Sequence, residues 1–276
     1  MGLNEIKDHQ KGCAQMKKPL LDVIFASDKR KSTLLLLQDG PKKIEFFLSS
    51  LNTTRQALLP QIKILEEHYL ISRNKDIYEL TDIGKLIIND MKPLLDTLEV
   101  FDSSIDYWGI RKLDSVPPHL LGRISELRKC TVLKPSVTEI NRLYKPFNLK
   151  KSTTKSVHLV GAFLYPDFYP TFVKLLKNSF TIDYIVSKEL LDKIKEENHE
   201  EFAVLLKNKS FNLYVYTKKA RFLFLGYDDT NFIIDFTTND GNFDVEHVLC
   251  KEKSALEWAK ELFEYYLKDS IPITEI

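Results

Sequence analysis

Residues 52–65 read NTTRQALLPQIKIL, and this stretch decides how the N-terminal part of the chain folds. The apolar residues Leu58, Ile62 and Leu65 recur at spacings of four and three, which predicts a helix with one buried face. Pro60 interrupts this pattern, and a proline inside a helix removes one backbone hydrogen bond and bends the axis. Either the helix begins before Pro60 and bends there, or Pro60 is its first residue. We favour the bent helix, because it keeps Leu58 in register.

The segments around this stretch predict a compact unit. Upstream, residues 19–26, 29–40 and 42–51 have the apolar spacing of three short helices. Downstream, residues 69–73 and 77–80 are β-prone and flank the turn sequence NKD, which predicts a hairpin. Three helices, a fourth helix and a hairpin are the element order of a winged helix-turn-helix, whose last helix enters the DNA major groove.

The charge distribution agrees with a DNA-binding unit. The net charge of the chain is +1, but residues 29–75 hold nine basic and four acidic side chains. Such a local surplus suits a surface that faces phosphates. Arginine and glutamine can also make paired hydrogen bonds to base edges. The candidate DNA contacts, with Thr54 as the helix N-cap, are Lys42, Lys43, Thr54, Arg55, Gln56, Gln61, Lys63, Arg73 and Lys75.

A long helical pattern follows the hairpin. Its apolar residues alternate between spacings of four and three, as along the seam of a coiled coil. Pro93 would kink this helix or divide it in two. The pattern predicts a dimerisation helix, and the alternative is a linker helix that packs on its own two domains. The residues predicted to form the seam are Ile87, Met91, Leu94, Leu98, Phe101 and Ile105.

The dipeptide Pro117-Pro118 marks the start of a second domain. Beyond Thr131 strands and helices alternate, which predicts a sheet covered by helices. Four later strand candidates at short spacing predict antiparallel pairing at one side of that sheet. The expected fold class is therefore α+β, with a flexible N-terminus (1–18), a winged helix-turn-helix (19–90), a linker or dimerisation helix (91–115) and a mixed α/β sensor domain (116–276).

Motifs of catalysis or cofactor binding are missing from the sequence. It contains no glycine-rich phosphate loop, no nucleophile elbow and no His-Glu-x-x-His, and its histidines are scattered. We therefore expect neither an enzyme nor a metal or cofactor site. Tyr165, Tyr169 and Tyr227 stand at the ends of predicted strands and are candidates for the rim of a ligand pocket, with ordinary packing as the alternative.

Cysteine usage and hydropathy indicate a cytoplasmic protein. Cys13, Cys130 and Cys250 are widely separated and form no C-x-x-C pair, so we expect packed or surface thiols, with a redox-sensing thiol as the alternative. No apolar run is long enough to span a membrane, and the N-terminus lacks the apolar core of a secretory signal.

The assembled chain resembles a family of archaeal transcriptional regulators, common in methanogens, that join an ArsR-like winged helix to a C-terminal domain of the FilR type. The resemblance covers about residues 20–270 and rests on NTTRQALLPQIKILEEHYLI and YELTDIGKLI, then on DSVPPHLLGRISEL, FYPTFVKLL and SALEWAKELFEYYLKDS. It implies a regulator that binds double-stranded DNA and perceives a signal through its C-terminal domain. We expect a homodimer whose C-terminal domain senses a small molecule or a partner. Some related sensor domains resemble phospholipase D folds without catalysis, and this chain has no H-x-K-x-x-x-x-D motif.

A second interpretation of the sequence is a protein-interaction module of the transcription or signalling machinery. In that case the winged helix would be a docking surface for a protein. The two interpretations differ in the expected effect of salt, because binding to DNA phosphates weakens steeply as salt rises.

Overall fold

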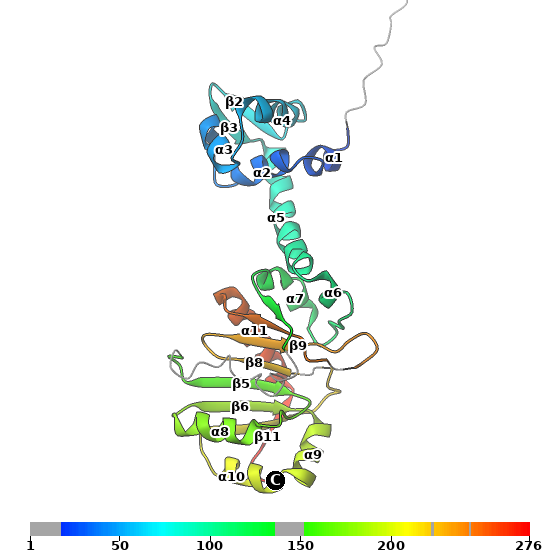
Figure 1. Ribbon diagram of the computed structural model, residues 1–276, viewed down its shortest axis with the longest axis vertical. Helices are drawn as coiled ribbons and strands as arrows, with labels where there is room; N and C mark the ends of the chain where they lie inside the picture. The colour runs from blue at the N-terminus through cyan, green and yellow to red at the C-terminus, as the bar shows by residue number, and fades with distance from the viewer. Residues whose placement is uncertain (1–17, 136–151, 222–223, 243) are drawn as a thin grey trace, which may run out of the picture. The chain divides into compact units, whose positions relative to one another are not determined.

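The computed structural model describes residues 18–135, 152–221, 224–242 and 244–276. The chain forms two compact units that divide between Leu94 and Leu95 (Figure 1). The N-terminus that we expect to be flexible, residues 1–18, lies outside the described residues except for Lys18. No helix among the described residues is long and apolar enough to cross a membrane.

The N-terminal unit has the element order of a winged helix-turn-helix, as expected. Its elements are α1 (Leu20–Phe25), α2 (Asp28–Leu36), β1 (Lys42–Lys43), α3 (Ile44–Ser50), α4 (Arg55–Glu67), β2 (Ile71–Asn74), β3 (Ile77–Leu80) and the first part of α5 (Asp82–Asp102). The predicted hairpin is β2–β3. Strand β1 was not predicted, and it pairs antiparallel with β3 to give the sheet order β1-β3-β2.

Helix α4 is anchored by its apolar stripe. Leu58, Ile62 and Leu65 are at most 1% exposed. The helix begins at Arg55, and the hydroxyl of its N-cap Thr54 accepts a hydrogen bond from the Ala57 amide at 3.4 Å.

The position of Pro60 settles the question that the sequence raises. Pro60 lies inside α4 on its exposed side, so the interpretation in which Pro60 starts the helix is wrong. Because proline has no backbone N–H, the hydrogen bond that it removes is the one to the carbonyl of Gln56. The stripe that begins at Leu58 remains in register across it.

The C-terminal unit is built on an eight-stranded sheet in the part that the structure describes. Its strands β5, β6 and β7 are parallel, and β8, β9 and β10 are antiparallel, so the predicted antiparallel pairing at one side of the sheet is confirmed. The strand order is β11-β7-β6-β5-β8-β9-β10-β4. The elements are α6 (Ile105–Trp108), α7 (Pro118–Leu121), the 3₁₀ helix η1 (Ile124–Leu127), β4 (Thr131–Leu133), β5 (Ser156–Gly161), α8 (Phe168–Lys177), β6 (Thr181–Val186), α9 (Lys188–Glu197), α10 (His199–Leu206), β7 (Phe211–Tyr216), β8 (Phe224–Tyr227), β9 (Phe232–Asp235), β10 (His247–Cys250), α11 (Lys253–Lys268) and β11 (Ser270–Ile273).

Two apolar cores lie on opposite faces of this sheet. Successive residues of a strand point to opposite faces, so Leu159 and Val160 of β5 belong to different cores. Leu159 packs in the core that includes Phe172 of α8 and Phe202 of α10. Val160 packs in the core that includes Trp258 of α11.

The predicted dimerisation helix is shorter than the sequence pattern indicates. Helix α5 ends at Asp102, and α6 is a separate short helix, so the seam does not continue to Ile105 within one helix. The Ser103 hydroxyl donates to the Val100 carbonyl at 2.8 Å, and short polar side chains of this kind compete with continued helical hydrogen bonding. Pro93 lies inside α5 and does not divide it.

Two of the three cysteines are joined, contrary to the expectation of separate thiols. Cys130 and Cys250 form a disulfide with a Cα–Cα distance of 4.4 Å. Cys130 precedes β4 and Cys250 ends β10, and the pairing of Leu249 with Thr131 places the two cysteines side by side. The pair is 120 residues apart in sequence, so no local spacing reveals it. Cys13 lies outside the described residues.

Two adjacent leucines of α4 test this packing. Leu58 is fully buried and Leu59 is 39% exposed. We expect Leu58→Ala to lower the free energy of unfolding by about 3 kcal/mol, through lost burial and a residual cavity. We expect Leu59→Ala to lower it by less than about 1 kcal/mol. Urea unfolding followed by circular dichroism checks both values. Equal losses of unfolding free energy in the two variants would show that α4 does not pack through Leu58 as described.

Candidate nucleic-acid interface and effector cavities

Helix α4 presents an exposed face opposite its buried stripe. The predicted contacts Gln56 and Lys63 lie on this face, and Thr54 and the exposed Arg55 lie at the N-terminal end of the helix. A helix N-terminus carries a partial positive charge and free backbone N–H groups, which favour an anion there. The structure therefore brings four of the predicted contacts onto one surface.

Gln61 differs from these contacts because its side chain is held by a neighbouring residue of the same unit. Its side-chain oxygen Oε1 accepts a hydrogen bond from Arg30 Nη1 at 2.8 Å, and Arg30 also donates to the Val23 carbonyl. Gln61 is half-buried and follows Leu58 by three residues, so it shares the side of α4 that faces the rest of the unit. This hydrogen bond joins α4 to α2. Arg30, one of the nine basic residues in the segment 29–75, is therefore engaged within the unit and is less available to DNA.

Arg55 forms an ion pair in the protein alone. Its Nη2 contacts Glu45 Oε1 of α3, and both side chains are more than half exposed. An exposed pair of this kind contributes little free energy, at most about 1 kcal/mol. Arg55 can therefore exchange Glu45 for another acceptor at low cost.

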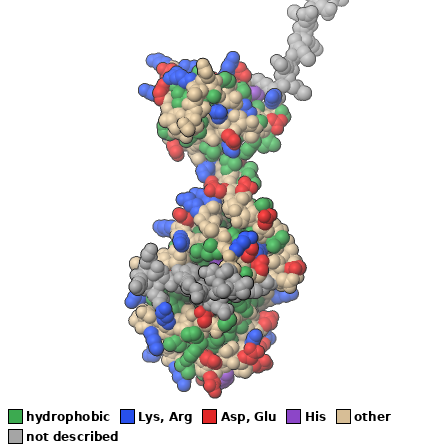
Figure 2. Space-filling model, in the orientation of Figure 1, with side chains coloured by type: hydrophobic (Ala, Val, Ile, Leu, Met, Phe, Trp, Pro, Cys, Tyr) green, Lys and Arg blue, Asp and Glu red, His purple; other side chains and the backbone are tan. Residues whose placement is uncertain are grey.

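The hairpin and β1 bring four more basic residues together. Lys42 and Lys43 of β1 lie opposite Tyr78 and Ile77 of β3, although more than 30 residues separate them in sequence. Figure 2 shows basic side chains over the part of the N-terminal unit where Figure 1 places the hairpin. Arg73 and Lys75 are exposed near its tip.

The tip of the hairpin holds its two basic residues differently. Arg73 Nε donates to the Lys75 carbonyl at 2.5 Å, and Arg73 lies over the Tyr78 ring at 5.5 Å, so this guanidinium is oriented. Lys75 has a positive φ of 57°, as expected in a tight turn. Among the described residues no side chain pairs with its amine.

The predicted seam residues divide into exposed and buried groups. Leu94, Leu98 and Ile105 are 51%, 43% and 59% exposed. Met91 is buried, and Phe101 packs edge-on against Trp108 at 5.7 Å within the C-terminal unit. Ile87 is half-buried. The exposed part of α5 also includes Leu86, which the sequence pattern did not single out.

The three predicted pocket tyrosines do not form one site. Tyr165 belongs to the core on the α8 face of the sheet, and Tyr227 belongs to the core on the α11 face. Each lines a different cavity. Tyr169 lies in α8, packs near Phe168 at 6.4 Å and lines neither cavity. Tyr165 lies in the loop after β5 and Tyr227 ends β8, and their positions in the sequence do not reveal which face of the sheet each will cover.

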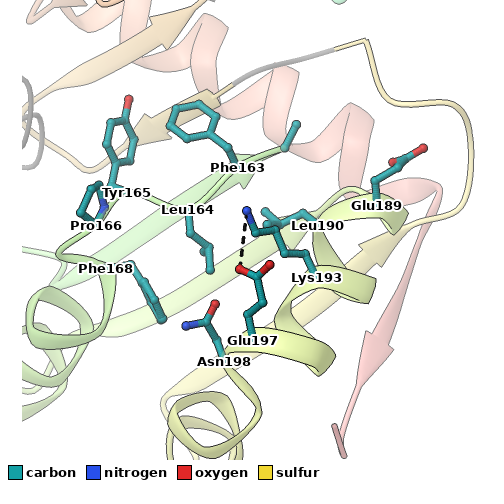
Figure 3. Close-up of a pocket in the computed structure, with 11 residues that line it drawn as sticks. Phe163, Leu164, Tyr165, Pro166, Phe168, Glu189, Leu190, Lys193, Glu197 and Asn198 are labelled. Carbon is teal, nitrogen blue, oxygen red and sulfur yellow. Dashed lines mark ion pairs between the residues drawn. The ribbon is translucent and has the colours of Figure 1, made fainter.

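The first cavity lies where β5 ends, between that loop and α9, and has a volume of about 430 Å³. Figure 3 shows Lys193 and Glu197 of α9 as an ion pair, at 3.6 Å, on one side of it. The Tyr165 hydroxyl points away from this pair (Figure 3). It donates to Asp235 Oδ2 at 2.8 Å, and burial raises the pKa of Asp235 to about 7.

The second cavity, of about 460 Å³, lies between α11 and strands β5, β6 and β8. Tyr227 lines it together with His158 and Asp183, whose side chains lie in contact at 3.0 Å (Nδ1 to Oδ2). The cluster of His158 and Asp183 was not predicted from the sequence, where each residue stands alone in an apolar strand. Both cavities have the size of a site for a small organic molecule.

Two family models identify the chain. The N-terminal domain of methanogenesis regulatory protein FilR1 matches residues 18–99, and the middle domain of FilR1 matches residues 140–269. The chain belongs to the FilR1 family. FilR1 from Methanothrix harundinacea (strain 6Ac) is 25% identical over 261 residues, which cover 91% of this chain and 58% of FilR1. The chain thus spans little more than half of that relative.

Both matched FilR1 domains come from a regulatory protein, in agreement with the expectation that the chain is not an enzyme. Among solved structures, the archaeal chromatin protein TrmBL2 is 14% identical and aligns over 92% of this chain and 97% of its own, with a TM-score of 0.41. The phospholipase D family member Nuc from Salmonella typhimurium is 10% identical over 52% of this chain and 99% of its own, with a TM-score of 0.36. Both TM-scores are too low to establish a common fold.

The raised pKa of Asp235 predicts a pH-dependent stability. The folded protein holds this proton more tightly than the unfolded chain, so stability falls as the pH rises from 3.8 to about 7. We expect Asp235→Asn, which keeps an acceptor for Tyr165, to be more stable than the parent by about 1 to 3 kcal/mol at pH 8 and by clearly less at pH 5. Urea unfolding at both pH values checks this.

A matched control for this experiment is Asp240→Asn. Asp240 is an exposed turn residue whose pKa is lowered by hydrogen bonds from Thr238 and Asn242. It should show no gain at pH 8. The same gain in both variants would mean that the loss of any negative charge, and not the burial of Asp235, is responsible.

Proposed function

We propose that this chain is a cytoplasmic, sequence-specific transcription regulator that binds double-stranded DNA and whose C-terminal unit senses a small molecule or a partner. The observation that carries the proposal is the exposed polar face of α4 beside the basic hairpin β2–β3. The membership of the FilR1 family, whose named member is a regulatory protein, supports it.

DNA binding would use the two halves of this surface differently. Helix α4 enters the major groove with its N-terminal end first, so that Arg55 and Gln56 meet base edges. Thr54 and the first amides of α4 lie near a phosphate. Lys75 and the β1 lysines contact the phosphate backbone, which positions the protein without reading sequence.

The exposed apolar residues of α5 support a homodimer. Leu94 and Leu98 are half exposed, although Ile88, Met91 and Val100 of the same helix are buried. Leu86 is exposed as well. Winged-helix regulators read paired half-sites as dimers, so a second copy would cover these residues. In this arrangement the dimer seam would not include Ile87, Met91 and Phe101, because these side chains pack within their own chain.

The effector would act on DNA binding through α5. The boundary between the two units falls within this helix, at Leu94 and Leu95. Because allosteric coupling requires that each ligand favour one of two states of a shared element, α5 is the element that a bound effector must influence.

The DNA contacts can be tested with operator DNA selected from the source genome. We expect Arg55→Ala to weaken specific binding by about 5- to 150-fold, since a lost base contact is worth about 1 to 3 kcal/mol. We expect Lys75→Ala to weaken all sequences alike and to reduce the slope of log affinity against log salt by about 1. Gel-shift titrations at several salt concentrations give both results.

Lys209→Ala serves as the control in these titrations, because Lys209 is an exposed lysine of the C-terminal unit. It should change neither affinity nor salt slope. If the parent protein binds DNA without salt dependence, or if Arg55→Ala retains full affinity and sequence preference, the winged helix is better described as a protein-docking surface.

Dimerisation through α5 is tested by Leu98→Asp. A buried charge at the centre of an apolar seam is strongly unfavourable, so we expect this variant to be a monomer by light scattering. Val204→Asp makes the same change at a 52% exposed position of α10 and should leave the dimer intact. A Leu98→Asp protein that remains dimeric places the interface elsewhere.

A further inference from the structure

The cavity beneath α11 has apolar walls and a polar floor. Its walls include Leu256, Phe263 and Leu267, which lie along one side of α11. Its floor comes from the sheet, where His158 and Asp183 are half-buried. A cavity of about 460 Å³ that is mostly apolar, with a few polar groups, is typical of a site for a small organic molecule.

Strand register assembles the floor from residues far apart in sequence. His158 of β5 lies directly opposite Asp183 of β6 and Tyr227 of β8. Asp183 in turn lies opposite Asn212 of β7. The four side chains form one row across four strands, on the sheet face that α11 covers.

This row fixes the imidazole ring of His158. The ring stacks on Tyr227, with centroids 4.7 Å apart and planes at 19°, and its edge meets Phe263 at 5.1 Å. Its Nδ1 lies 3.0 Å from Asp183 Oδ2, and Asn212 donates to Asp183 Oδ1 at 2.8 Å.

The contact with Asp183 determines the tautomer of His158. Burial alone would raise the pKa of Asp183, but the close contact with His158 and the hydrogen bond from Asn212 lower it, so Asp183 is a carboxylate. A carboxylate beside Nδ1 favours the proton on that nitrogen. In the neutral imidazole this tautomer leaves Nε2 as a hydrogen-bond acceptor, and no described residue donates to it.

Asp228 supplies a second acceptor at the same cavity. It is only 2% exposed. Its Oδ1 accepts from the Thr230 amide and hydroxyl, each at 2.7 Å, and from the Asn231 amide at 2.8 Å. Its Oδ2 is buried and receives no hydrogen bond from any residue that the structure describes. A buried oxygen without a donor is costly, and such atoms in native proteins usually meet a ligand or water.

The charges around the cavity are predominantly negative. Lys253 and Lys260 are 3.7 and 3.8 Å from Glu257 and Glu264, so these four charges cancel in pairs. The remaining acidic groups in the lining are Asp183, Asp228, whose pKa burial raises, and Asp229, with His158 as their neighbour. Two of them, Asp228 and Asp229, each have one buried oxygen that receives no hydrogen bond from the described residues. Acceptors and negative charge together favour a ligand that donates hydrogen bonds and is positively charged.

We propose that this cavity binds an organic amine, with a primary ammonium group on an apolar body. The ammonium donates to Asp228 Oδ2 and His158 Nε2, and the body lies against Leu256, Phe263 and Leu267. The proposal rests on the proposed sensing function, for which it names the chemical class of the effector. Tyr227, predicted from the sequence as a pocket residue, holds the imidazole in place.

The test uses the full chain and three probes of similar shape and different charge. 2-Phenylethylamine carries the ammonium, 2-phenylethanol is neutral and 3-phenylpropionate is an anion. Titration calorimetry should detect binding of the amine, at least tenfold weaker binding of the alcohol and none of the anion. Failure of the amine to bind, or equal binding of the alcohol or the anion, overturns the proposal.

Two substitutions locate the site. Asp228→Asn keeps an oxygen for the turn and removes the charge, so the affinity for the amine should fall at least tenfold. Asp240→Asn makes the same change in another turn, away from the cavity, and should leave the affinity unchanged. Leu256→Trp fills the cavity from α11 and should also abolish binding, which covers the case of an unstable Asp228 variant. Amine binding that survives both cavity variants overturns the proposal.

A gel-shift assay with and without the amine separates this proposal from the proposed function. If the parent protein binds DNA but not the amine, the amine proposal fails and the DNA-binding function stands. If the amine binds in the cavity without changing DNA affinity, the cavity assignment holds and its role in regulation fails.

Discussion

Burial of three side chains on one side of α4 determines what its other side can do. Leu58, Ile62 and Leu65 lock the rotation of this helix about its own axis, because each loses its core contacts if the helix turns. The opposite face, with Gln56 and Lys63, and the exposed first turn with Arg55 are therefore presented in one orientation. The Arg30–Gln61 hydrogen bond also restrains this rotation, on the side of α4 that faces the rest of the unit. A rigid helix face is what base readout requires, since paired hydrogen bonds tolerate little misplacement.

The sheet of the C-terminal unit uses the same kind of constraint through its register. Parallel pairing of β5 with β6 places His158 beside Asp183, and a slip of β5 by one residue would send His158 to the α8 face. The register is held by apolar residues such as Leu159 and Val160, which pack in two different cores. A polar cluster half-buried under α11 thus depends on apolar packing on both faces of the sheet.

What the sequence predicted well is local. Helix α4, its N-cap Thr54 and the hairpin follow from patterns that fit within 30 residues, and each came out at the expected place. What it missed depends on long-range pairing. The placement of Lys42 and Lys43 beside β3, the Arg30–Gln61 contact and the Cys130–Cys250 bond all join segments that no periodicity connects. The heptad pattern of α5 was misleading past Asp102, because a repeat of apolar residues does not show which of them the chain buries in its own core.

The disulfide between Cys130 and Cys250 also acts on the chain when it is not folded. It closes a loop of 120 residues that includes most of the sheet. Joining the ends of so long a loop removes conformational freedom from the denatured chain, worth on the order of 4 to 5 kcal/mol in the chain-entropy description. The edge strand β4 also stays next to β10 during unfolding. The stability of this unit is therefore linked to the thiol–disulfide balance of its surroundings, in addition to its packing.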